Sequence, residues 1–319
     1  MRFEVRPLLP PDSERTPFPV LESEVFLVLL FFCIAGAIVT ANHNRRVGRI
    51  DRRGATVFAG AGFLMAIGPF AFGAHHVAGT WEIALVIMGL SWAAFVGGAI
   101  WVFYVAIEPY VRRNWPDSLI SWTRLCSGRS GTPLVASHIL AGVTAAEVFV
   151  LVAQPGMHAL FSNIDWGGHS GLNTVTPSIA LMLVLAQIGF AFALVMVLIV
   201  VLLRLLIGKV WLADLLTAFL LSFSSFGVFG NGAWRAASAI VFFTAATSAW
   251  IWLLRHFGFL TLVVFWVTGN LLFFVPLVTM GWLAGPSIGY HLIPVAVAGW
   301  ALWVIIAANQ SKPPTESAA

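Results

Sequence analysis

Long apolar runs, separated by short polar breaks, account for most of the chain. Crossing the hydrocarbon core of a bilayer takes roughly 17 to 25 apolar residues in a helix. Inside lipid every backbone N–H and C=O must bond within the chain, and these runs are too long for barrel strands, so they predict α-helices. The predicted spans lie near 25–41, 55–74, 83–107, 135–153, 179–207, 215–230, 239–254, 259–283 and 290–308.

The pattern therefore predicts an all-α, polytopic transmembrane bundle of nine helices. The runs 215–230 and 239–254 are shorter than the others. They fit either two untilted spans or a re-entrant pair that enters and leaves from the same side. The sequence leaves both arrangements open.

Composition supports a membrane protein and excludes several other classes. Apolar residues make up 60% of the chain and charged residues 9%, against roughly 25% charged in a typical globular domain. Of the 30 charged residues, 20 lie in 1–24, 42–54 and 108–134. This segregation excludes a water-soluble domain, a disordered chain and a nucleic-acid binder, despite the net charge of +4. The partner that the composition indicates is the lipid bilayer.

The positions of the basic residues predict how the chain threads the membrane. Lys and Arg beside a span are retained on the cytoplasmic side. With nine spans, 13 of the 17 basic residues fall on the side of 42–54 and 108–134, and four fall on the other side. We therefore expect an extracytoplasmic tail over 1–24, a membrane domain over 25–308 and a cytoplasmic tail over 309–319. The N-terminus is outside and the C-terminus inside.

The connection 108–134 predicts a short amphipathic helix on the inner leaflet. Trp115, Leu119, Trp122 and Cys126 recur at spacings of four, three and four, which places them on one helix face. Arginines beside that face would meet anionic phospholipids. The predicted leaflet contacts are Arg112, Arg113, Trp115, Trp122, Arg124 and Arg129. A solvated loop whose arginines only fix the orientation remains the alternative.

The same connection, EPYVRRNWPDSLISWTRLCSGRSGTPLV over 108–135, resembles the multi-pass C-terminal membrane domain of bacterial serine/threonine protein kinases. A second similar stretch is RRVGRIDRRGA over 45–55. The resemblance implies a multi-pass anchor or sensory module of the bacterial inner membrane, with a kinase or another signalling protein as its partner. The chain carries no glycine-rich phosphate loop, His-Arg-Asp or Asp-Phe-Gly motif, so we expect no catalysis and no cofactor.

Ionisable residues within predicted spans are candidate functional sites, because a charge at membrane depth is costly unless it is paired or protonated. Glu147 lies in the middle of the fourth span, nine residues after His138. The two residues face different sides of one helix, so they do not pair with each other. We expect a cation from another helix, Arg235, to be the partner of Glu147. A structural role competes with a rival function, a small-solute transporter or channel that uses Glu147.

Two groups of histidines do not fit a metal site. His158, Asp165 and His169 fall in the outer connection, but their spacing matches no zinc signature. His75 and His76 are adjacent and point about 100° apart on a helix end, so they do not share a ligand. We predict no metal site.

The orientation gives a direct prediction. A membrane-impermeant thiol reagent should label cysteines introduced into 108–134 only after the inner membrane has been opened, because the basic connection is held on the cytoplasmic side. Cysteines introduced into the outer connection 154–178 should be labelled in intact cells. Labelling of 108–134 in intact cells would contradict the predicted threading.

Overall fold

The computed structural model describes residues 18–48, 50–74, 79–160, 175–224, 233–275 and 284–310. In these ranges the chain is helical and contains no strand. The α-helices are α1 (Phe18–Arg46), α2 (Arg52–Gly73), α3 (Thr80–Asn114), α4 (Ile120–Cys126), α5 (Pro133–Leu160), α6 (Val175–Ile207), α7 (Val210–Ser224), α8 (Ala233–Phe257), α9 (Phe259–Phe274) and α10 (Ala284–Gln310), and a 3-10 turn, η2, covers Pro116–Leu119.

The all-helical fold class is confirmed, whereas nine spans and the orientation remain predictions. Among the described residues, six helices are long and apolar enough to cross a membrane: Arg52–Gly73, Thr80–Asn114, Pro133–Ala153, Ser178–Ile207, Ile240–Phe257 and Ser287–Gln310. Two shorter apolar helices, Val210–Ser222 and Phe259–Phe274, correspond to the predicted runs 215–230 and 259–283. Residues 225–232 and 276–283 lie outside the described residues. The chain is thus a multi-pass helical membrane protein.

Several helices extend beyond the predicted apolar runs. The first begins at Phe18, inside the predicted tail 1–24, and continues through the polar segment to Arg46. The third continues to Asn114 through Pro109, Arg112 and Arg113. Hydropathy marks only the part of a helix that suits lipid, and hydrogen bonding carries the helix beyond it. Both helices therefore bring charged residues to their ends.

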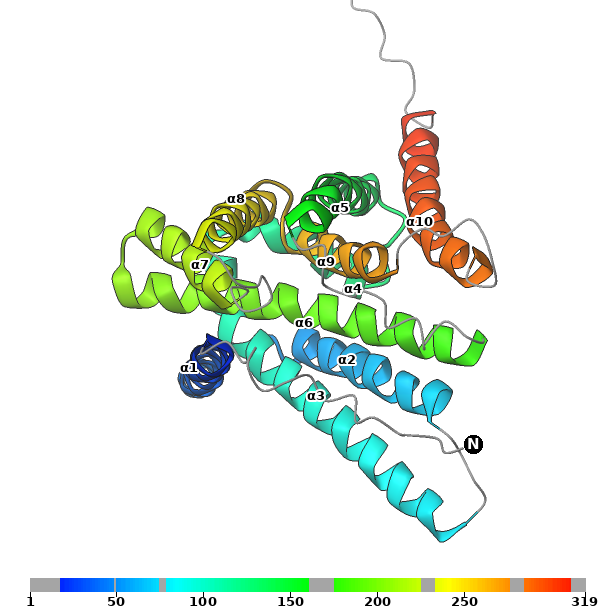
Figure 1. Cartoon of the computed structure of the whole chain (residues 1–319), viewed down its shortest axis with the longest axis horizontal. Coiled ribbons are helices and arrows are strands. Elements are labelled where there is room, and N and C mark those ends of the chain that lie inside the picture. Colours follow the sequence, from blue (N-terminus) through cyan, green and yellow to red (C-terminus); the bar gives the residue numbers. More distant parts are fainter. Residues whose placement is uncertain are drawn as a thin grey trace, which may run out of the picture.

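The helix α6 runs through the middle of the molecule (Figure 1). On one side of it lie α2 and α3, which pack against each other, and α2 also packs along α6. On the other side lie α5, α8 and α9, with α9 between α5 and α6. The last helix, α10, contacts mainly α5. This arrangement makes α6 the most buried of the candidate spans.

Aromatic rings fill the centre of the core. Phe58 is 1% exposed and contacts rings from four other elements. Its centroid lies 4.5 Å from that of Tyr104, 4.1 Å from that of Trp122 and 5.6 Å from that of Phe190. Phe259 adds a fourth ring at 6.0 Å. This cluster joins α2, α3, α4, α6 and α9.

Large apolar side chains also cover the outside of the helices. Four examples with about two-thirds or more of their surface exposed are Phe31 (74%), Trp81 (82%), Leu151 (73%) and Trp303 (67%). So many large apolar side chains on the outside are unusual for a water-soluble monomer. In a bilayer these side chains meet lipid tails, so their exposure carries no penalty.

Two glycines allow α9 to approach its neighbours closely. A Cβ on Gly189 of α6 would lie 2.6 Å from the carbonyl oxygen of Trp266, and a Cβ on Gly142 of α5 would lie 2.8 Å from that of Thr261. Both obstacles are backbone atoms, which cannot rotate away. The contacts of α9 with α5 and α6 thus depend on these two glycines, as is usual for small residues between membrane helices.

We predict that Gly189→Ala destabilises the protein by about 1–3 kcal/mol, because the added methyl group forces α6 and α9 apart. The matched control is Gly98→Ala, since nothing lies within 4 Å of a Cβ at Gly98. Unfolding of the purified protein by denaturing detergent measures both variants. Equal stability of the two variants would contradict the close α6–α9 contact.

Candidate functional site

Helix ends from most of the bundle meet around the connection 115–132. Ser121 of α4 contacts His138 at the start of α5, and Trp115 contacts Arg204 near the end of α6. The turn between α8 and α9 also touches it, because a Cβ on Gly258 would lie 2.5 Å from the carbonyl oxygen of Ser118. We call this region the charged end; it comprises 115–132 and the ionisable residues Asp51, Glu108, Arg112, Arg204, Asp214 and Arg255.

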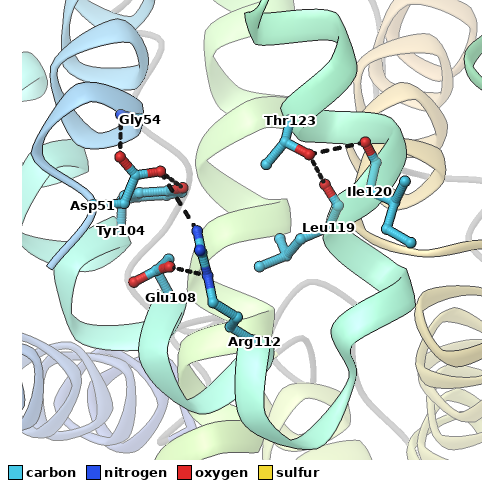
Figure 2. A network of polar contacts seen from close by, with 8 residues as sticks. All are labelled: Asp51, Gly54, Tyr104, Glu108, Arg112, Leu119, Ile120 and Thr123. Carbon is cyan, nitrogen blue, oxygen red and sulfur yellow. Dashed lines mark hydrogen bonds and ion pairs between the residues drawn. The ribbon is translucent and has the colours of Figure 1, made fainter. Parts of the chain in front are cut away.

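The first polar network of the charged end joins α2 and α3 (Figure 2). Asp51 caps α2 by accepting a hydrogen bond from the Gly54 amide at 2.9 Å, and the Tyr104 hydroxyl donates to its other oxygen at 3.5 Å. Arg112 reaches between two carboxylates, 2.6 Å from Glu108 and 3.6 Å from Asp51. Glu108 is only 4% exposed, and a buried carboxylate needs a nearby positive charge to be stable. The guanidinium of Arg112 supplies that charge.

The second network joins α6, α7 and α8. Arg204 is 6% exposed, and its Nη2 and Nε atoms lie 2.6 and 3.2 Å from the same oxygen of Asp214. The other carboxylate oxygen of Asp214 pairs with Arg255. The guanidinium carbon of Arg204 also lies 4.4 Å from the centre of the Trp115 ring, a cation–π contact. One carboxylate thus holds two arginines, and one of them reaches the connection.

A third contact fixes the start of α5. His138 Nδ1 lies 2.8 Å from the hydroxyl of Ser121, which is fully buried. The backbone oxygen of His138 accepts a hydrogen bond from the Thr261 hydroxyl at 3.0 Å. His138 therefore links α4, α5 and α9 and does not pair with Glu147, in agreement with the helix spacing.

The connection packs into the bundle, which differs from the prediction of a helix on the leaflet surface. Trp122 is 8% exposed and lies against Phe58 and Phe259. Its predicted contact with the leaflet is therefore corrected, because its ring is inside the protein. Trp115 is half-buried. The amphipathic pattern of 115–126 predicted correctly which face of the segment is apolar and covered. It could not predict whether lipid or protein covers that face, because both are apolar.

The predicted arginines lie on the outside of the connection. Arg112 exposes 58% of its side chain although it is ion-paired. Arg113, Arg124 and Arg129 are exposed. Their contact with anionic phospholipids remains a prediction.

The structure does not bring the other predicted residues together. Glu147 lies midway along α5 and is half-buried, and within the described residues it has no hydrogen bond or ion pair. The side chains of Arg235 and His158 lie outside the described part of the chain, as do Asp165, His169, His75 and His76. The predicted pairing of Glu147 with Arg235 is therefore untested.

Sequence reasoning missed Asp51 and Asp214 as the carboxylates that organise the charged end. Arg204 and Arg255 are among the 13 basic residues that predict the orientation, and the sequence pattern gives them no other role. A signal was present, because Arg204 and Asp214 flank the α6–α7 turn at a separation of ten residues. The chain reverses direction at Gly208, between α6 and α7. The side chains of Arg204 and Asp214 therefore lie at the same height along the two adjacent helices. The distant pairs, Asp51 with Arg112 and Asp214 with Arg255, leave no such local signal.

Neither a metal site nor a reactive thiol is found in the described residues. No group of three His, Cys, Asp or Glu side chains in these ranges is arranged to hold a metal ion. Burial, followed by the charge of Asp51, raises the pKa of the Cys126 thiol to about 11. This thiol is therefore protonated near neutral pH, and the exposed Ser127 is the better position for a labelling probe.

Comparison with known proteins gives one distant similarity. A stretch of 99 residues, 30% of this chain, is 28% identical to CASP-like protein 2A2 from Picea sitchensis. The chain spans about half of that relative, 47% of its length. No family model matches the chain, and no solved structure matches it. The predicted resemblance to the membrane domain of bacterial kinases is not shown by these comparisons.

We predict that Asp214→Asn destabilises the protein by about 3–5 kcal/mol, because it leaves Arg204 buried without a counter-charge. Asp117→Asn is the control, since Asp117 is exposed in the same region. Detergent unfolding measures the difference. A loss no larger than that of the control would show that Arg204 is neutralised by another group.

Proposed function

We propose that this protein is a non-catalytic membrane module that couples the packing of its helices to the cytoplasmic connection 115–132. The observation that carries the proposal is the chain of contacts from Arg255 through Asp214 and Arg204 to Trp115. A shift of α6, α7 or α8 would have to break or move these contacts. Such a shift would therefore reach the connection.

The coupling is supported by how the connection is held. It contacts elements far apart in the sequence through Trp115, Ser118, Ser121 and Trp122. Packed interfaces of this kind tend to have discrete arrangements and do not deform continuously. A small displacement of one helix end is thus converted into docking or release of 115–132.

The exposed part of the connection supplies a surface for a partner. Asp51, Glu108 and Asp214 neutralise Arg112, Arg204 and Arg255 inside the charged end. Arg113, Arg124 and Arg129 are exposed and have no carboxylate partner within the described residues. These exposed positive charges favour anionic lipid headgroups or an acidic protein surface.

The proposed partner and membrane rest on the resemblance in 45–55 and 108–135 alone. On that basis we propose a kinase or another signalling protein as the partner and the bacterial inner membrane as the location. The N-terminus would lie outside and the C-terminus inside. The similarity to CASP-like protein 2A2 fits a membrane role without adding a partner.

The rival function is passage of a small solute along α5. The observation in its favour is Glu147, a half-buried carboxylate without a polar partner among the described residues. Glu147→Gln separates the two functions, because it would abolish solute flux into liposomes if the carboxylate binds the solute. Retained function in signalling with this variant would favour the coupling proposal.

We expect Trp115→Ala to release the connection from the bundle, since it removes the contact with Arg204. Hydrogen exchange of the backbone amides of 116–126 should accelerate by about ten-fold or more, because docking protects them. Trp211→Ala is the matched control, as Trp211 is 66% exposed on α7. Equal exchange in the two variants would contradict the coupling.

The partner is tested separately by co-purification from native membranes. The double variant Arg124→Gln, Arg129→Gln should no longer co-purify with a signalling protein that co-purifies with the unaltered chain. The stability of the variant should be unchanged. Recovery of no signalling protein by the unaltered chain would contradict the proposed partner and leave the coupling measurement intact.

A further inference from the structure

An open groove of about 210 Å³ lies between α1 and α3 near the charged end. Its walls are Ile38, Ala41, Asn42 and Arg45 from α1 and Trp101 and Val102 from α3. The α1 residues recur at spacings of three, one and three, so they form one continuous helix face. The groove therefore runs along the two helices over this short stretch.

The groove changes from apolar to cationic along its length. From Ile38 to Arg45 is seven residues, about 10 Å along the helix axis. Ile38 and Val102 present hydrocarbon, whereas Asn42 and Arg45 present hydrogen-bond donors. Trp101 adds an indole ring, the side chain most typical of the boundary between hydrocarbon and headgroups. A phospholipid has this same order of chemistry, from acyl chain to phosphate.

Arg45, unlike Arg112, Arg204 and Arg255, has no carboxylate partner among the described residues. Within the described residues its only polar contact is a long hydrogen bond of 3.4 Å from Nη2 to the Asn42 side-chain oxygen. Arg112, Arg204 and Arg255 are all paired with carboxylates. The guanidinium of Arg45 is thus available for a phosphate, which it can bind in bidentate geometry.

A buried side chain fixes the two helices against each other at the cationic end of the groove. Asn44 is 9% exposed, and its amide donates to the backbone oxygens of Val105 and Ala106 at 2.9 and 3.2 Å. Asn44 lies next to Arg45 but faces α3. A pre-formed site costs little ordering of the protein when a ligand enters.

We propose that the α1–α3 groove is a binding site for one anionic phospholipid. Its phosphate lies on Arg45 and Asn42, and an acyl chain lies along Ile38, Val102 and Trp101. Lipid is the occupant because α3 is a candidate membrane span and the groove opens on the outer surface of the bundle. This site is separate from the connection 115–132 and does not rest on the proposed function.

The test uses the full chain in mild detergent, with bound lipid measured by native mass spectrometry. Phosphatidylglycerol and phosphatidylcholine with the same acyl chains are the two probes. We expect preferential retention of phosphatidylglycerol, and about five- to ten-fold weaker retention by Arg45→Gln. Arg46→Gln is the matched control, because Arg46 is exposed and lies outside the groove.

A second pair of variants tests the apolar part. Ile38→Trp should fill the groove and lower retention of both lipids, whereas Val39→Trp, on the exposed neighbouring position, should lower neither. Unchanged melting temperatures show that the variants fold.

Three results would overturn the proposal. Equal retention of the two lipids would leave no role for the phosphate contact. Equal losses with Arg45→Gln and Arg46→Gln would show a diffuse charge effect. Displacement of the lipid by glycerol phosphate at matching concentration would identify a site for a free phosphate compound.

Discussion

A buried arginine must have a counter-charge, and at Arg204 this requirement organises one end of the molecule. Removing a guanidinium from water costs several kcal/mol unless a carboxylate and further hydrogen bonds compensate. Asp214 provides both, which fixes the start of α7 against the end of α6. Because Asp214 also pairs with Arg255 and Arg204 lies on Trp115, the position of α8 and of the connection depends on the same carboxylate.

Hydropathy predicted much of the fold because lipid imposes a simple constraint on helices. The apolar runs located every described long helix. Helix ends were harder to predict, as α1 and α3 show, since a helix continues into polar sequence when hydrogen bonds and ion pairs support it. The number of spans depends on α7 and α9, whose apolar lengths are marginal.

The candidate site was predicted only in part, because ion pairs between distant segments leave no periodic pattern. His138 was singled out as a polar residue in a span, but its partner Ser121 lies in another helix. Trp122 shows the opposite case. Its spacing identified a buried face, whereas the surface that covers it, formed by Phe58 and Phe259, is set by tertiary packing.

The burial of Trp122 has a consequence for how the chain is synthesised. Its ring rests on Phe190 of α6 and Phe259 of α9, which leave the ribosome long after residue 122. Until then Trp122 has only Phe58 of α2 to pack against, and the rest of the surface that encloses it is missing. Maturation of this segment is thus completed late in translation, so a nascent chain that stops before α9 cannot complete it.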